Sequence, residues 1–274
     1  MIQTIKNFTR KVKIVIFQAI FIDLFCFELL LKLIPLRFKK NAALMALGMS
    51  NQYFIYKESL SDSLNNSYME ILKKEYQRNE ITRQKLCEHI IQPYLLPQMT
   101  VVDFGCGPGI LAREVAKHCK KVLAIDISYG AIACAKILKN AENINYIRIN
   151  RNDLNIIDDC SVDLIYSFAV FQHMNDEKFQ EKLEQFYNIL KPNGKIICHL
   201  ALNESQYSHL EKDNSPFFNY LRNKFSLRML YRSIENVTEM VVKAGFKESN
   251  VIPVRDLSNV EDDIVNDHIF VLSK

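Results

Sequence analysis

The feature of this sequence that most constrains its fold is a regular alternation of strand-like and helix-like stretches beginning at Thr100. The strand-like runs are short and rich in Val, Ile and Leu, whereas the stretches between them have helical spacing. Such alternation is typical of parallel βαβ units, in which ligands bind beyond the carboxyl ends of the strands. We therefore predict an α/β fold with a Rossmann-like, doubly wound, mostly parallel seven-stranded sheet. The predicted strands are 100–104, 121–125, 145–149, 162–167, 195–202, 249–254 and 268–272, and the predicted helices are 111–118, 129–139, 176–190 and 233–244.

The residues before this alternation have a different character. Tyr68 to Ile91 has helical spacing, and Asn41 to Ser61 has the composition of a covering segment rather than a separate core. We therefore predict a helical N-terminal extension or cap over 1–82 and a ligand-binding domain over 83–274. Within that domain, a polar and aromatic insertion at 204–232 interrupts the alternation and is predicted to be a substrate lid.

Positive charge is concentrated at the N-terminus. Residues 1–40 hold eight Lys or Arg and two acids, a net of +6, so the rest of the chain carries −2 of the total of +4. Ile14 to Ile34 is almost wholly apolar, but Asp23 lies near its middle, where a charge in a membrane span is costly. We rank a helix packed on the body first, peripheral membrane contact or self-association through 12–36 second, and a span third.

Composition excludes several classes of function. A net charge of +4 is too small to indicate a nucleic-acid surface. The seven cysteines are scattered, with no C-x-x-C pair and no Cys/His cluster at zinc spacing. We therefore predict reduced thiols, no metal site, no nucleic-acid partner and a cytoplasmic location, with peripheral membrane contact as an alternative.

A glycine-rich turn follows the first predicted strand. Three of the seven glycines fall at 105, 107 and 109, where the missing Cβ lets a backbone bend sharply and approach a ligand. Residue 110 is Ile where a dinucleotide fingerprint has Gly or Ala, and the run lacks the G-K-[ST] of a P-loop. The turn therefore disfavours NAD and excludes a P-loop nucleotide site.

Acidic residues stand at or near the ends of three successive predicted strands. Asp103, Asp126 and Asp153 would together form an acid-rimmed crevice at the carboxyl edge of the sheet. Asp126 is placed to accept hydrogen bonds from a ribose diol, and Asp153 to accept one from an exocyclic amine. Such a rim repels phosphate and favours a cationic, phosphate-free nucleoside. Structural roles remain open, because these acids could instead cap helices or tie the loop through backbone N–H groups.

At this point the sequence resembles the class I S-adenosylmethionine-dependent methyltransferases, in the branch often called type 11 or type 12 small-molecule methyltransferases. The resemblance covers about residues 83–274. Asn193 departs from it, standing where Gly is commoner in the family. The motifs that carry the resemblance are Val101 to Gly109, Ile125 to Ser128, Asn152 to Leu154, Asp163 to Ser167 with Phe171 to His173, and Leu190 to Gly194.

The family implies S-adenosylmethionine as cofactor and assigns parts of it to residues. Residues of the Gly-rich turn would border the methionine part, Asp126 would bind the ribose hydroxyls, and Ile127 would pack on adenine, whose edge Asp153 and Leu154 would hold. Arg78 or Arg83 could pair with the methionine carboxylate or simply lie on a solvated helix face. The candidate cofactor-binding residues are Asp103, Gly105, Cys106, Gly107, Gly109, Asp126, Ile127, Asn152, Asp153, Leu154, Ser167 and Phe168.

His173 is the candidate catalytic base. It follows the fourth predicted strand by six residues and could take a proton from a phenol, carboxylic acid or ammonium nucleophile. The competing interpretation is that it only orders its loop. The candidate substrate-binding residues lie in this loop and in the two segments that could close over the crevice, although aromatic residues there also suit plain packing; they are Tyr53, Tyr56, Gln172, Phe217 and Tyr231.

The sequence therefore predicts an enzyme that transfers a methyl group to a nitrogen or oxygen nucleophile of a small molecule, such as a specialised metabolite. The alternative is a methyltransferase for a lipid or quinone at the membrane surface, which the basic and apolar N-terminus favours. Methylation of a nucleic-acid base ranks low, because Ser167 to Val170 lacks the Pro-Pro-aromatic pattern of such enzymes. A catalytically silent binding module is disfavoured by the intact cofactor motifs.

Overall fold

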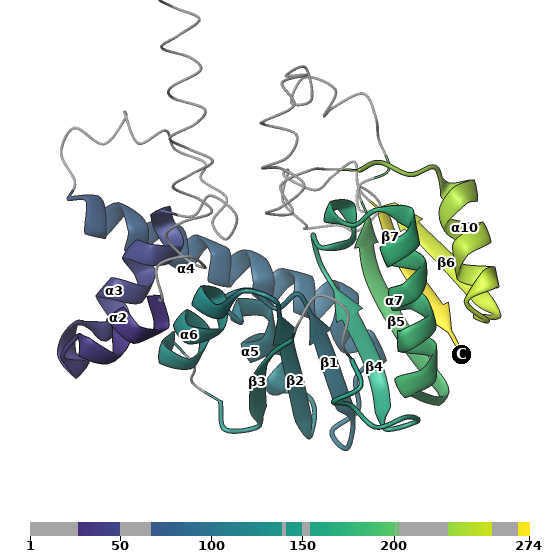
Figure 1. The fold of residues 1–274 in the computed structure, drawn as a ribbon, viewed down its shortest axis with the longest axis horizontal. Helices are drawn as coiled ribbons and strands as arrows, with labels where there is room; N and C mark the ends of the chain where they lie inside the picture. The colour runs from purple at the N-terminus through teal and green to yellow at the C-terminus, as the bar shows by residue number, and fades with distance from the viewer. Residues whose placement is uncertain are drawn as a thin grey trace, which may run out of the picture.

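A computed structural model gives an α/β fold in which one twisted sheet is covered by helices on both faces (Figure 1). The structure describes residues 27–49, 67–138, 141–149, 154–200, 202, 230–253 and 268–274. Its strands are β1 (Thr100–Phe104), β2 (Lys121–Asp126), β3 (Ile144–Arg148), β4 (Val162–Ser167), β5 (Leu190–Leu200), β6 (Glu248–Pro253) and β7 (His268–Ser273). Its longer helices are α2 (Phe27–Leu33), α3 (Leu36–Met49), α4 (Tyr68–Leu86), α5 (Ile110–Ala116), α6 (Tyr129–Leu138), α7 (Asp176–Ile189) and α10 (Ile234–Lys243).

The strand order confirms the predicted seven-stranded, doubly wound sheet. The order is β3-β2-β1-β4-β5-β7-β6, and the pairs from β3 to β5 are all parallel. β7 is antiparallel to both of its neighbours, β5 and β6. Because the chain order reverses direction between β1 and β4, the carboxyl ends of these two strands are where such folds bind ligands.

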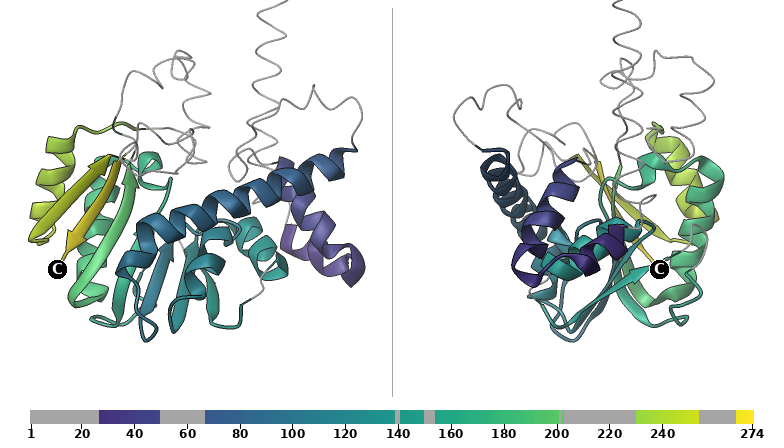
Figure 2. Two further views of the ribbon diagram at one scale, coloured as in Figure 1. Left: turned by 180° about the vertical axis from the view of Figure 1, so that it is seen from behind. Right: turned by 60° about the vertical axis from the view of Figure 1, so that its left-hand side comes forward.

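Both faces of the sheet are buried, as its nearly continuous apolar strands require. On one face, Phe104 of β1 packs against Phe171 and against Phe186 of α7, and the rings contact each other in stacked and edge-on geometry. The other face packs under α4 and α5 and includes two tyrosines, Tyr146 and Tyr166. The left view of Figure 2, in which the molecule is seen from behind, shows α4 running along this face.

Local sequence explains most helix ends. Ser67 caps α4 in a capping box with Glu70, Asn175 caps α7, and Ser233 caps α10. Gly245 follows α10 with a φ of +99°, a conformation typical of glycine just after the end of a helix. α4 runs unbroken across the predicted domain boundary between residues 82 and 83.

One strand begins earlier than predicted. The expected helix over 176–190 ends at Ile189, and β5 begins at Leu190 instead of residue 195. Leu190 pairs with Val162, and a register shift between 162 and 164 accommodates the turn-forming residues that follow, with Asn193 at a φ of +66°. Pro192 and Gly194 therefore lie within the irregular first part of β5 and not in a loop before it.

The described part of the N-terminal extension packs against the β3 end of the sheet. α2 contacts α6, and α3 contacts both α6 and α4 (Figure 1). Leu31 and Leu47 are buried in this contact against Cys134 and Leu138 of α6. Most of the apolar stretch 14–34 lies outside the described residues. Among the helices that are described, none has both the length and the apolar composition needed to cross a bilayer.

Candidate functional site

The Gly-rich turn joins the carboxyl end of β1 to α5. Gly105, Gly107 and Gly109 all have φ between +51° and +80°, a region that favours glycine. At Gly105 a Cβ would lie 2.2 Å from Cγ2 of Val170, so the turn packs flush against the loop after β4. The first two turn amides, of Gly105 and Cys106, both donate to the carbonyl of Ile125 at the end of β2.

Asp126 holds this turn in place. One carboxylate oxygen accepts from the N–H of Gly107 at 2.8 Å, and the other accepts from the N–H of Ser128 at 2.8 Å. The carboxylate is half-buried at the end of β2. It therefore fixes the loop geometry and places both carboxylate oxygens at the carboxyl edge of β2.

Asp103 carries a buried carboxyl group and is the penultimate residue of β1, two residues before Gly105. It is 3% exposed and is in register with Tyr166 on β4. Burial raises its pKa to about 8; the nearby Asp126 also raises that pKa, whereas the Tyr166 hydroxyl and Arg83 lower it. Among the described residues, its Oδ2 atom has no hydrogen-bond partner. A buried acceptor without a donor is costly, and a cationic ligand at this edge would supply one.

Arg83 of α4 is close enough to Asp103 to act on its pKa, whereas Arg78 pairs with Glu75 at 2.9 Å on the same helix. Of the two arginines considered for the methionine carboxylate, Arg78 and Arg83, it is therefore Arg83 that lies near Asp103. The thiol of Cys106 is also buried, and burial raises its pKa well above the ordinary value. Cys106 is consequently a neutral wall of the turn rather than a nucleophile.

The loop after β4 forms the other side of the site. The Ser167 hydroxyl donates to the carbonyl of Phe104 at 2.9 Å and ties β4 to β1. Phe168 stacks on His199 of β5, with ring centroids 5.8 Å apart, and Nδ1 of His199 accepts from the N–H of Ala169 at 3.3 Å. Ala169 has a φ of +58°, which is uncommon for a residue with a Cβ and typical of functional loops.

Sequence reasoning missed His199, which is buried at the carboxyl end of β5. A polar residue in the apolar run of that strand was the available signal. The sequence patterns could not show that its imidazole lies beside the loop after β4, because that contact spans 30 residues.

His173 and Gln172 lie in a short 3-10 turn, Phe171–His173, after β4. The His173 backbone N–H donates to the carbonyl of Val170 at 3.0 Å, and its side chain is half-buried. Gln172 is buried, and its Oε1 atom has no partner within the part of the chain that is described. Its backbone carbonyl accepts from the N–H of Leu230 at 2.7 Å, which brings the half-buried Tyr231 to the same edge.

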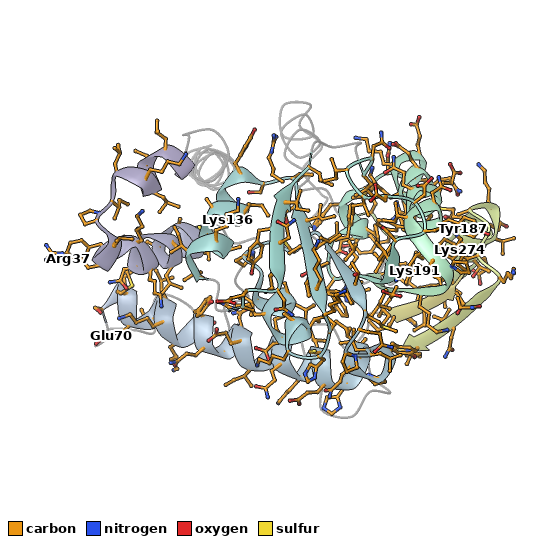
Figure 3. All side chains as sticks on the ribbon, turned by 90° about the horizontal axis from the view of Figure 1, so that it is seen from below. Arg37, Glu70, Lys136, Tyr187, Lys191 and Lys274 are labelled. Carbon is orange, nitrogen blue, oxygen red and sulfur yellow. The ribbon has the colours of Figure 1, made fainter. Side chains whose placement is uncertain are left out.

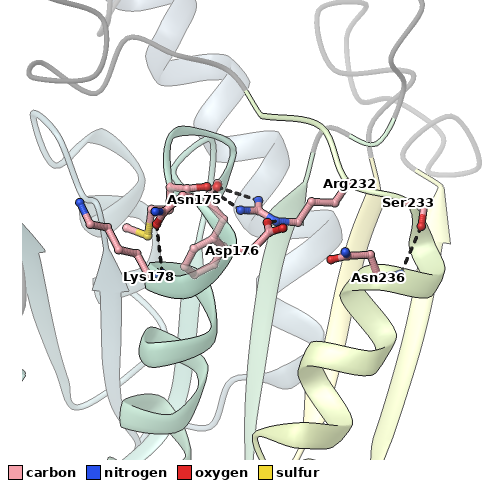
Figure 4. Close-up of polar contacts among 8 residues, drawn as sticks. Asn175, Asp176, Lys178, Arg232, Ser233 and Asn236 are labelled. Carbon is pink, nitrogen blue, oxygen red and sulfur yellow. Dashed lines mark hydrogen bonds and ion pairs between the residues drawn. The ribbon is translucent and has the colours of Figure 1, made fainter. Parts of the chain in front are cut away.

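Arg232 anchors this return of the chain, and sequence reasoning missed it as well. Its guanidinium donates to the carbonyls of Phe171 and Met174 and pairs with Asp176 at 2.7 Å (Figure 4). It also lies over the ring of Phe179, 4.8 Å from its centroid. The end of the predicted lid, 204–232, is therefore fixed to the loop that carries His173.

The adenine side of the predicted site is described only in part. Ile127 directly follows β2 and is 43% exposed, a large apolar side chain open to a ligand. Leu154, in contrast, is buried in the core on the α7 face. Five predicted site residues lie outside the described residues, namely Tyr53, Tyr56, Asn152, Asp153 and Phe217.

The residues present fit a cationic nucleoside. A buried Asp103 oxygen without a hydrogen-bond donor among the described residues, a turn built on three glycines and an exposed Ile127 lie at the carboxyl edge of β1 and β2. Within the described residues, no group of three or more His, Cys, Asp or Glu is placed to hold a metal ion. The six described cysteines are free thiols, and five of them are buried.

Comparisons with known proteins give a family match and several relatives. Residues 102–198 match the family model described as a methyltransferase domain. A ubiquinone biosynthesis O-methyltransferase from Coxiella burnetii is 30% identical over 120 residues, which is 40% of this chain and 50% of that protein. The chain thus spans about half the length of the curated relatives it matches.

Solved structures share the fold at low sequence identity. A methyltransferase from Haloferax volcanii, solved in complex with the Trm112 activator, aligns with a TM-score of 0.55 at 20% identity. The alignment covers 73% of this chain and 92% of the other. An S-adenosylmethionine-dependent methyltransferase from Thermotoga maritima aligns with a TM-score of 0.51 at 20% identity, over 74% of this chain and 95% of the other.

Proposed function

Because residues 102–198 form a class I S-adenosylmethionine-dependent methyltransferase domain of the type 11 branch, we propose that this protein methylates a nitrogen or oxygen of a small molecule. The observation that carries the proposal is the buried Oδ2 of Asp103, which has no hydrogen-bond partner among the described residues. It lies just before a tight glycine turn, in which a Cβ added at Gly105 would clash with Val170 and one added at Gly109 with Tyr146. Bound at that turn, S-adenosylmethionine supplies a methyl group already activated on a sulfonium. The chain then has to align the acceptor, exclude water and take up a proton.

The cofactor would be held by three kinds of contact. Asp103 and the backbone of Gly105 and Gly107 would meet its cationic amino-acid part, at the sharp turn that the positive φ angles of these glycines form. Asp126, held at the end of β2 by the amides of Gly107 and Ser128, would accept from the ribose hydroxyls. Ile127 would cover one face of the adenine.

His173 is proposed as the base that receives the proton of the acceptor. Its side chain is half-buried, and its loop is held by Arg232, so the imidazole is presented from a fixed turn. An acceptor N–H or O–H that loses its proton to the imidazole exposes the attacking lone pair. Replacing His173 with Gln should lower kcat at about neutral pH with little change in cofactor affinity.

A second candidate acceptor is a quinone or another lipid. Two observations favour it: the match to a ubiquinone biosynthesis O-methyltransferase, and the exposed apolar and basic side chains of α2 and α3. A phenolic hydroxyl on such a ring is an oxygen nucleophile of the class proposed above.

The test is methyl transfer from labelled S-adenosylmethionine to a panel of acceptors, with the products identified by mass spectrometry. The panel pairs each water-soluble phenol or amine with an analogue carrying an isoprenoid tail. Labelled product with any member, lost in the Asp126→Ala variant, supports methyl transfer at this site. Undetectable binding of both S-adenosylmethionine and its demethylated product by calorimetry overturns the proposal.

A further inference from the structure

Helices α2 and α3 form a corner whose two faces are both apolar. The inner face is accounted for, since Leu31, Ala43 and Leu47 are buried against α6 and α4. The outer face still carries large apolar side chains that are exposed in the structure. We call these outer residues, from 29 to 40, the α2–α3 corner.

Exposure is highest where the two helices meet. Leu33, the last residue of α2, is 75% exposed, and Leu36, the first residue of α3, is 84% exposed, with Pro35 between them. Large apolar residues are strongly concentrated here, because six of the fourteen exposed ones in the described chain fall within residues 29–45. These six are Leu29, Leu30, Leu33, Leu36, Phe38 and Met45.

The charges of the same segment are mainly positive. Helices α2 and α3 contain four basic residues, Lys32, Arg37, Lys39 and Lys40, and one acid, Glu28. Arg37 lies over the Phe38 ring, 4.6 Å from its centroid, and reaches away from the body of the protein (Figure 3). Basic side chains interleaved with exposed leucines form the pattern of a surface that enters the boundary between lipid head groups and acyl chains.

We propose that the α2–α3 corner docks this protein on the surface of an anionic lipid bilayer, with Leu33 and Leu36 inserted and the basic side chains at the head groups. A second copy of the chain fits this surface less well, because it would oppose four positive charges with four more. An anionic bilayer satisfies both features, since it offers apolar depth under negative charge. This inference does not rest on the proposed methyl acceptor, because binding is measured without turnover.

The apolar contribution is tested with the full-length chain and vesicles. Co-sedimentation with phosphatidylcholine vesicles, with and without phosphatidylglycerol, is measured for wild type and for Leu33→Ser/Leu36→Ser. We expect wild type to bind the anionic vesicles preferentially and the variant to bind at least about tenfold more weakly. The matched control is Ile234→Ser/Val242→Ser on α10, which removes two exposed apolar side chains at the other end of the sheet and should leave binding unchanged.

The electrostatic contribution is tested in the same way. Arg37→Gln/Lys40→Gln should weaken binding about 30-fold, from about 1 kcal/mol per basic side chain and 1.4 kcal/mol per tenfold. Lys178→Gln/Lys243→Gln makes the same change in net charge at exposed positions of α7 and α10 and should have little effect. Added salt should weaken the binding of wild type more than that of the Arg37/Lys40 variant.

Three results would overturn the proposal. They are no preference of wild type for anionic vesicles, binding that survives the leucine substitutions, or equal loss in the corner variant and its control. Light scattering that shows a dimer dispersed by Leu33→Ser/Leu36→Ser, without vesicle binding, would assign the corner to self-association instead. Far-ultraviolet circular dichroism and thermal melting establish that each variant is folded.

Discussion

Asp103 should couple the affinity for S-adenosylmethionine to pH. Its carboxyl is buried with a pKa of about 8, so it is about nine-tenths protonated in the ligand-free protein at about pH 7. A cationic ligand beside it favours the carboxylate, and the pKa should fall toward its ordinary value of about 3.9. Binding at about pH 7 must then release about 0.9 proton from this group.

The sign of the pH dependence follows from the direction of that shift. Because binding lowers the pKa of an acid, affinity rises with pH while the free carboxyl is protonated. The expected slope is about tenfold in the dissociation constant per pH unit below about pH 8, with no further gain above it. The ligand's own amino group also titrates, but it does so equally in any variant of the protein.

The assay is titration calorimetry in two buffers that differ in ionisation enthalpy, which measures the protons released on binding. Asp103→Asn, which keeps the size of the side chain and removes the titrating group, should lower affinity and abolish the additional slope and proton release. If wild type and the Asn variant show the same slope between about pH 6 and about pH 8, the assignment of this carboxyl to the ligand is wrong.

The same shift predicts an opposite effect on the stability of the ligand-free protein. The folded-state pKa of Asp103 is raised above the unfolded value, so its contribution is fully favourable only below about pH 4 and is lost as pH rises through about 8. The loss is about 1.4 kcal/mol per pH unit between those limits. Asp103→Asn should therefore raise the melting temperature of the ligand-free protein more at about pH 8 than at about pH 5, as thermal denaturation can show.

Substitutions at Gly105, Arg232, Asp176 and His199 test the loops around the site. Gly105→Ala places a methyl group 2.2 Å from Val170 at a positive φ, so calorimetry should show at least about a tenfold loss of cofactor affinity, partly restored by adding Val170→Ala. Arg232→Met removes two buried hydrogen bonds and should lower the unfolding free energy by about 2 kcal/mol in denaturant titrations. Asp176→Asn should cost less than about 1 kcal/mol, because the Asp176 side chain is 63% exposed, and an equal loss would contradict this account. His199→Phe keeps the ring stack but loses the acceptor of the loop amide, so kcat should fall, whereas His199→Asn should retain most activity; equal kcat in the two variants would refute a positioning role.

Sequence patterns predicted the sheet because the forces that form it are local and periodic. Each βα unit is recognised by a short apolar run followed by a stretch with helical spacing. Strands joined through a helix in this way run parallel in the sheet. The exception was the start of β5, where Leu190 pairs with Val162 through a register shift. Pro192 and Asn193 have low strand propensity, so the strand was predicted to begin only at residue 195, although pairing with β4 begins at Leu190.

The cofactor side of the candidate site was predictable for the same reason. Gly105, Gly107 and Asp126 stand at the ends of adjacent strands, so strand order alone brings them together. The sequence did not indicate that the Asp126 carboxylate accepts hydrogen bonds from the backbone N–H groups of Gly107 and Ser128. Its predicted ligand role and its structural role do not exclude each other, because each carboxylate oxygen can accept more than one hydrogen bond.

The acceptor side depends on contacts between distant parts of the chain. Arg232 reaches back 61 residues to the carbonyl of Phe171, and His199 holds a loop amide 30 residues before it. Neither contact leaves a period or spacing in the sequence, because each is one side chain meeting one backbone group. Both act on the loop that carries His173, which methyl-acceptor chemistry needs to be fixed to within fractions of an ångström. Substitutions at Arg232 and His199 should therefore alter turnover and choice of acceptor before they alter cofactor affinity.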